Sequence, residues 1–121
     1  TALAAQDAQK FAVTAFVERD FKQAYALLAN RTQRAYSLEK IQAEMAKIHP
    51  SGYPATVKTT EYEPMPGQAG MNIFLIGEND TEEFYYRLVM EGTQGSGYRV
   101  SGFWRGNGPY PGSKLRQTLQ N

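Results

Sequence analysis

The apolar residues of this chain repeat with two different periods, and the change between them occurs near residue 50. From Ala4 to Ala29 the sequence contains neither glycine nor proline and is rich in alanine, which favours a helix. Apolar residues recur there at helical spacing and form one stripe: Ala8, Phe11, Ala12, Ala15 and Phe16. Beyond residue 54 apolar and polar residues tend to alternate, which is the period of a strand. Helices followed by strands predict an α+β domain.

The helical half is predicted to hold a long helix with a bend near Arg19, or two abutting helices, and then a separate helix. Asp20 is a residue type that caps a new helical turn, and the polar run 30–34 is predicted to end this region. Ser37 is a plausible N-cap for the second helix, which Pro50 terminates. The buried face of that second helix is predicted to consist of Leu38, Ile41, Met45 and Ile48.

The second half is predicted to form four strands, at 55–63, 71–77, 82–91 and 98–105. Because short turns join them, the sheet is predicted to be antiparallel, with one face buried on the helical stripe. In the third strand the inward residues are predicted to be Phe84, Tyr86, Leu88 and Met90. In the last strand simple alternation places Tyr98, Val100, Gly102 and Trp104 inward, and Arg99, Ser101, Phe103 and Arg105 outward.

Composition excludes several classes of function. The chain has 121 residues, the size of a single domain, and its net charge of +1 argues against a nucleic-acid partner held by electrostatics. With no cysteine and one histidine, neither a thiolate metal site nor a typical zinc site is predicted. The apolar runs are too short to predict a membrane span. No glycine motif has the spacing of a phosphate-binding loop, so no cofactor is predicted.

The order of elements and two local stretches resemble the NTF2-like (cystatin-like α+β) superfamily. The stretch A-V-T-A-F-V-E-R-D-F-K-Q-A-Y-A-L-L-A resembles its first helices with the bend between them, and G-Y-R-V-S-G-F-W resembles its closing strand. The resemblance covers residues 4–106 and leaves 107–121 as a C-terminal tail of a single domain spanning 1–121. It implies a cone in which the helices pack in the concave face of a curved four-stranded antiparallel sheet.

What the resemblance implies about function is broad. The superfamily includes isomerases and dehydratases, transport factors, secretion-system subunits and domains of bacterial envelope proteins. We expect a non-enzymatic binding or assembly module of an exported, periplasmic or envelope-anchored bacterial protein. The chain begins at Thr1 rather than at methionine, which is compatible with removal of a signal peptide or lipid-anchor segment, although a cytoplasmic location is also compatible with the sequence.

One alternative is a small-molecule-binding protein with an aromatic pocket. Tyrosine hydroxyls and the indole N–H let an apolar wall offer hydrogen bonds to a small apolar or amphipathic ligand. The candidate ligand-binding residues are Tyr25, Tyr36, Tyr53, Tyr86, Tyr98 and Trp104. The simpler interpretation of these residues is that they fill the core, with hydroxyls reaching its rim.

The outer face of the sheet is the candidate surface for a protein partner or a homodimer, because arginine and aromatic residues are enriched at interfaces. The candidate partner-binding residues are Tyr85, Arg87, Arg99, Phe103 and Arg105. The simpler alternative is that this face is exposed to solvent, as in many antiparallel sheets.

The last alternative is an enzyme of isomerase or dehydratase type. Asp20, Tyr25 and His49 are its candidate residues, because enzymes of the superfamily carry Asp, His or Tyr inside the cone. The competing interpretation gives Asp20 an N-capping role and makes His49 a solvated or capping residue at the end of its helix. The acidic run at 78–83 is predicted to be a solvated hairpin tip rather than a calcium loop.

Overall fold

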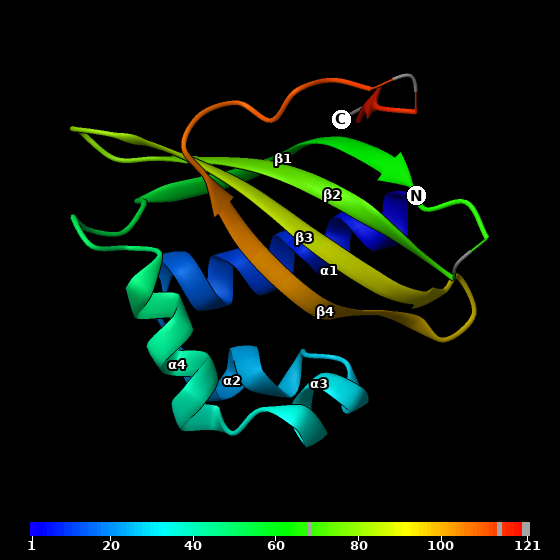
Figure 1. The fold of residues 1–121 in the computed structure, drawn as a ribbon, viewed down its shortest axis with the longest axis horizontal. Helices are drawn as coiled ribbons and strands as arrows, with labels where there is room; N and C mark the ends of the chain where they lie inside the picture. The colour runs from blue at the N-terminus through cyan, green and yellow to red at the C-terminus, as the bar shows by residue number, and fades with distance from the viewer. Residues whose placement is uncertain (68, 114, 120–121) are drawn as a thin grey trace.

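The computed structural model describes residues 1–67, 69–113 and 115–119. In this part of the chain it shows an α+β fold, with helices in the N-terminal half and a curved antiparallel sheet that does not close into a barrel (Figure 1). The helical segments are α1 (Ala2–Ala12), the π-helix η1 (Val13–Val17), α2 (Phe21–Ala26), α3 (Asn30–Ala35) and α4 (Leu38–Lys47). The strands are β1 (Thr56–Pro64), β2 (Gly70–Glu78), β3 (Glu83–Thr93), β4 (Gly97–Gly106) and β5 (Gln117–Thr118).

The predicted bend in the first helical region has a specific backbone cause. The α-helix widens into η1, and Arg19 then adopts a left-handed conformation with φ of 57°. Asp20 starts α2 as its N-cap, because its carboxylate accepts a hydrogen bond from the backbone N–H of Gln23 at 3.2 Å. Ser37 caps α4 in the same way, accepting from the N–H of Lys40 at 3.1 Å. Both predicted N-caps are therefore confirmed.

The run 30–34 was predicted to be a polar terminator, and this prediction is wrong. These residues belong to α3, a helix of six residues. Thr32 is buried there and donates its hydroxyl hydrogen to the carbonyl of Ser101 in β4 at 3.1 Å. The contact with the sheet supports a helix that is too short to be stable alone.

The described sheet has five strands in the order β4-β3-β2-β1-β5, where four were predicted. The additional strand β5 comes from the segment that was predicted to be a tail, and it pairs with β1 at Glu61 and Tyr62. It was missed because two residues are too few to show a period. The four longer strands form an antiparallel meander, as their short connections indicated.

The core lies between α1, η1 and the concave face of the sheet, where α1 crosses behind the strands (Figure 1). The alternation predicted for β3 is confirmed, since its four inward residues are fully buried. Phe11 and Phe16 of the helical stripe are also fully buried, and Phe16 stacks on Tyr86 with ring centroids 4.5 Å apart. The small alanines of the stripe let α1 approach the sheet closely. The aromatic rings of the stripe and of β3 fill the remaining space on the concave face.

In β4 the predicted inward and outward faces are partly exchanged. Met90 of β3 pairs with Val100, but the next residue, Val89, pairs with Gly102, so Ser101 is the extra residue of a β-bulge. The bulge shifts the alternation by one position, because side chains point to alternate faces of a strand. Phe103 consequently packs in the core against Phe11, while Trp104 lies on the outer face.

Candidate functional site

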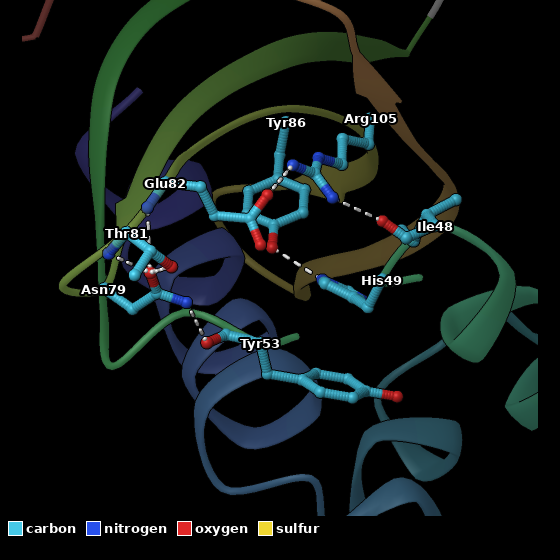
Figure 2. Close-up of polar contacts among 8 residues, drawn as sticks. All are labelled: Ile48, His49, Tyr53, Asn79, Thr81, Glu82, Tyr86 and Arg105. Carbon is cyan, nitrogen blue, oxygen red and sulfur yellow. Dashed lines mark hydrogen bonds and ion pairs between the residues drawn. The ribbon is translucent and has the colours of Figure 1, made fainter. Parts of the chain in front are cut away.

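The only histidine lies in a buried polar cluster where the end of α4 meets the sheet. Figure 2 shows His49 between the backbone of its own helix and the side chain of Tyr86 in β3. His49 Nδ1 is 2.7 Å from the carbonyl oxygen of Met45, and Nε2 is 2.7 Å from the Tyr86 hydroxyl oxygen. His49 is 5% exposed and Tyr86 is fully buried. The prediction of a capping role is therefore confirmed, but the prediction of a solvated side chain is wrong.

The tautomer of His49 follows from its partners. A carbonyl oxygen only accepts, so Nδ1–H donates to Met45 and the unprotonated Nε2 accepts from the Tyr86 hydroxyl. Burial lowers the pKa of His49, outweighing the Met45 carbonyl, which raises it, and the charge of Arg105 lowers it further. Burial also raises the pKa of Tyr86, so its hydroxyl keeps the proton that it donates. The pair is neutral, and both ring nitrogens of His49 are engaged in hydrogen bonds. This arrangement suits a structural link between the helix and the sheet better than a general base.

Arg105 connects this cluster to the surface. Its guanidinium donates to the Ile48 carbonyl at 2.8 Å and to the Glu82 carboxylate at 3.0 Å (Figure 2). The guanidinium also lies 4.3 Å from the centroid of the Phe84 ring. One side chain of β4 thereby holds the C-terminal end of α4 and the turn before β3. The prediction that Arg105 points outward is wrong, because the bulge at Ser101 turns it to the concave side.

The acidic turn between β2 and β3 is more ordered than a solvated tip. The Asn79 side chain accepts hydrogen bonds from the backbone N–H groups of Thr81 and Glu82, both at 2.9 Å, and donates to the Tyr53 carbonyl at 3.0 Å. Glu82 is directed toward Arg105 rather than toward solvent (Figure 2). Among the described residues, no group of three or more His, Asp or Glu side chains has a geometry that could hold a metal ion.

A groove of about 480 Å³ lies between β4 and α4, adjacent to this cluster. Residues 101–105 of β4 form one wall without interruption. Because neighbouring side chains of a strand point to opposite faces, a wall made of five consecutive residues consists of the strand's edge rather than of one face. The opposite wall consists of Lys40, Ile41 and Glu44 of α4 with Ile48 at its end, and Thr32 and Tyr36 close the groove.

Exposed aromatic residues gather at this groove. Tyr36 is 50% exposed and Trp104 is 45% exposed, and both line it. Trp104 is held in place, because its ring lies 4.3 Å from the Arg87 guanidinium and extends over Gly102. A Cβ atom at position 102 would lie 2.5 Å from the indole ring, so glycine is needed for this approach. An open, partly apolar groove with a fixed indole is the arrangement typical of a binding site.

The structure brings only part of the predicted ligand-binding set together. Tyr36 and Trp104 both line the groove. Tyr53 stacks on the ring of His49, and the Nε2 atom of that ring contacts the Tyr86 hydroxyl. Tyr25 does not line the groove, although it donates its hydroxyl hydrogen to the Tyr36 carbonyl at 2.6 Å. The remaining member, Tyr98, is far along β4, where its backbone N–H donates to Asp7 at 2.9 Å. The predicted single aromatic pocket is thus divided among separate places.

The three candidate catalytic residues are engaged separately. Asp20 caps α2, Tyr25 donates to backbone carbonyls, and His49 joins Met45 to Tyr86. No interaction among the described residues joins any two of the three.

The predicted partner-binding face is also divided. Tyr85 and Arg87 lie on the outer face, whereas Phe103 and Arg105 face inward. Arg99 extends past the edge of the sheet and donates to the carbonyls of Ala26 and Leu28 at 2.8 and 3.1 Å.

The chain's own C-terminal segment covers part of the outer face. Tyr110 packs on Phe74 of β2 with ring centroids 5.4 Å apart. The guanidinium of Arg116 lies 3.6 Å from the centroid of the same Phe74 ring and contacts Glu61 and Glu63, both at 3.5 Å. The outer face is therefore not the bare sheet surface that the prediction assumed.

Sequence reasoning missed the contribution of α4 to the groove. Ile41 and Ile48 were predicted as core residues, and Lys40 and Glu44 carried no signal, because the same spacing occurs on any solvated helix. Only the position of α4 beside the β4 edge gives these residues a shared surface.

Comparisons of the chain with models of protein families, with curated proteins and with solved structures find no match. None of the helices in the described segments is long and apolar enough to cross a membrane. The groove and the buried cluster are therefore the features of this chain from which a function can be proposed.

Proposed function

We propose that this chain is a binding module with an NTF2-like fold, and that the α4–β4 groove is its binding site. The observation that carries the proposal is the presence of two half-exposed aromatic side chains, Tyr36 and Trp104, at one groove. Large exposed aromatics cost free energy in water, and contiguous ones are a feature of binding surfaces. Support for the fold comes from bent N-terminal helices on the concave side of a curved antiparallel meander.

Binding is favoured over catalysis because the charged side chains that line the groove are already engaged in ion pairs. Lys40 pairs with Glu44 at 3.2 Å, and Arg105 pairs with Glu82 at 3.0 Å. His49 and Tyr86 are buried, and neither residue lines the groove. The ligand we propose is amphipathic, with an apolar or aromatic part against Trp104 and Tyr36 and a polar part near Lys40.

We further propose that the module belongs to an exported or envelope-associated bacterial protein, a proposal that rests on the sequence resemblance alone. Cell fractionation with antibodies against this domain is the test. Recovery of the protein only with cytoplasmic markers would contradict it.

Trp104 makes the groove proposal testable, because it is the chain's only tryptophan and its emission reports the groove directly. A panel of small aromatic acids, steroids and short peptides is titrated while tryptophan emission and the thermal midpoint are recorded. A ligand of the groove is expected to shift the emission and raise the midpoint, since it binds the folded state.

Two variants separate the groove from the rest of the surface. Tyr36→Ala removes one groove aromatic and is expected to weaken binding at least about tenfold, the effect of losing about 1.4 kcal/mol of binding free energy. Ile76→Ala removes an exposed apolar residue of the outer face and is expected to leave binding unchanged. Equal losses in the two variants, or no response of Trp104 to any member of the panel, would reject the groove as the site.

A further inference from the structure

The two edges of the sheet differ in how far their backbone groups are covered by other segments of the chain. Along β1, the side chain of Gln9 in α1 donates to the Val57 carbonyl at 2.7 Å and accepts from the Thr59 N–H at 3.0 Å. This side-chain amide makes the two hydrogen bonds that a neighbouring strand would make. Further along the same edge, β5 pairs with β1, and the Leu119 N–H donates to the Thr60 carbonyl at 2.9 Å. The β1 edge is thus covered over much of its length.

The β4 edge is covered only at its beginning. The Ala29 N–H donates to the Val100 carbonyl at 2.7 Å, and the Val100 N–H donates to the Leu27 carbonyl at 3.2 Å, forming a short parallel bridge. The hydroxyl of Thr32 then donates to the Ser101 carbonyl at 3.1 Å. This edge therefore already forms a bridge to one other segment of the chain, at Leu28 and Val100.

Beyond Ser101 the edge is open in the described part of the chain. In an antiparallel pair only alternate residues bond to the neighbouring strand, so alternate N–H and C=O groups of residues 102–106 point away from β3. No described residue donates to or accepts from these outward backbone groups. They face the α4–β4 groove, whose wall is the same strand edge. An exposed edge of this kind pairs readily with another strand.

We infer that the groove binds an extended peptide segment of another protein, which adds to the sheet as a strand beside residues 102–106 of β4. This inference rests on the groove being the binding site and names its ligand class. Main-chain hydrogen bonds to the open edge supply affinity, and alternate side chains of the peptide supply specificity. One set of side chains faces Ile41 and Ile48 in the groove, and the opposite set lies beside Trp104.

Charge on the groove wall specifies the peptide further. Lys40 and Lys47 both contact the single carboxylate of Glu44, at 3.2 and 4.0 Å, while Arg105 is balanced by Glu82. Lys40 lines the groove whereas Lys47 does not, so Glu44, which the two lysines share, only partly compensates the positive charge of Lys40 at the groove wall. The preferred segment carries a large apolar residue with an acidic residue near it, and a basic residue at that position is disfavoured.

The test uses the full chain and a set of acetylated octapeptides of alternating valine and threonine. Their central residue is Phe, Tyr, Trp or Leu, and a neighbouring position is Glu, Gln or Lys. Binding is measured by nuclear magnetic resonance, together with Trp104 emission for peptides without tryptophan. We expect binding in the order Glu, Gln, Lys, and slower hydrogen exchange, by at least about tenfold, at amides within 102–106.

Backbone methylation of the peptide distinguishes strand addition from side-chain binding. The best octapeptide is made in two forms, with N-methyl groups on alternate residues in one or the other register. One form carries its methyl groups on the peptide nitrogens that face β4, and only this form is expected to lose binding, by at least about tenfold. The reason is that these nitrogens can no longer donate hydrogen bonds to the open edge. Ile76→Ala in the protein serves as the unaffected control.

Each other outcome overturns the inference. Peptides that bind without slowing exchange at 102–106, or equal binding of the two methylated forms, exclude strand addition and leave the groove as a side-chain site. Failure of every octapeptide at concentrations on the order of 1 mM, while small aromatic acids or steroids still shift Trp104 emission, rejects a peptide ligand but not the groove. Protection of the edge amides that rises with protein concentration identifies a second copy as the occupant. Absence of any Trp104 response to peptides and small molecules rejects the proposed function as well.

Discussion

The concave side of the sheet and the α4–β4 groove meet at the edge strand β4, and their aromatic residues differ in exposure to solvent. On the concave side Phe16, Tyr86 and His49 are buried, and the two polar side chains satisfy each other. At the groove Tyr36 and Trp104 stand half exposed. The comparison shows that buried side chains occupy the concave side, as the simpler interpretation of the aromatic residues predicted, and that the half-exposed aromatics lie at the edge of the sheet, where we propose that binding occurs.

The largest contrast is expected from truncating a core ring. Phe16→Ala removes a fully buried side chain that stacks on Tyr86, and it is expected to cost about 3–5 kcal/mol of unfolding free energy. Ile76→Ala, at an exposed position, is expected to change stability by no more than about 0.5 kcal/mol. Chemical denaturation of both variants measures the difference. A Phe16 variant as stable as the Ile76 variant would mean that the concave side is not tightly packed.

Arg105 belongs to both regions, so its replacement should affect both. Arg105→Met leaves the Glu82 carboxylate and the Ile48 carbonyl without their donor, which is expected to cost about 1.5–3 kcal/mol. Loss of the link to Ile48 should also loosen the α4 wall and weaken groove binding. Arg105→Lys keeps the charge but not the planar fork, so a smaller loss is expected. If Met and Lys variants match the original chain in denaturation and binding, the shared wall does not depend on this guanidinium.

The stability of the buried side should also depend on pH, through His49. The folded-state pKa of His49 is lowered from 6.5, so the unfolded chain binds more protons, and stability should fall as pH drops below about 6.5. One group contributes a slope of at most about 1.4 kcal/mol per pH unit. Hydrogen bonds from Ser113 and Arg31 lower the pKa of Glu63 and Glu91, respectively, so those carboxylates lose stabilisation only below about 4.5.

Unfolding free energies measured between pH 5 and 7, roughly the interval between these windows, therefore report mainly on His49. In the His49→Gln variant the slope over this interval is expected to disappear, whatever the variant's absolute stability. A slope of equal size in both proteins would assign the pH dependence to other groups.

The smallest expected change in stability is at the groove. Tyr36→Ala removes a half-exposed ring whose backbone carbonyl still accepts from Tyr25, and it is expected to change stability by no more than about 0.5 kcal/mol. Its effect should appear in binding alone, the opposite of the result for Phe16→Ala. Unfolding of this variant at substantially lower denaturant would show that Tyr36 is a core residue.

Local features of the fold could be predicted because they depend on neighbours in the sequence. Asp20 and Ser37 are N-caps as predicted, since capping needs only a side-chain oxygen within three residues of a free N–H. The inward residues of β3 are also correct, because that strand keeps a period of two throughout.

The errors in the candidate sites have one main cause. Ser101 has no property that marks it as a bulge, yet the bulge exchanges the faces of Phe103, Trp104 and Arg105. Trp104, which was predicted to point inward, is a surface aromatic residue. Arg105, which was predicted to point outward, binds the C-terminal end of α4. Likewise, β5 is too short to show a pattern, although with Tyr110 and Arg116 its segment covers part of the outer face.

The sequence by itself determined the order of helices and strands, the antiparallel pairing of the meander, and the apolar helical stripe that packs on the concave side. These follow from periodicity, capping and turn length, which act over a few residues. Only the tertiary structure decided which edge of the sheet remains open and which aromatics reach water. That outcome depends on contacts between residues far apart in the chain, such as Gln9 with Val57 on one edge and Thr32 with Ser101 on the other.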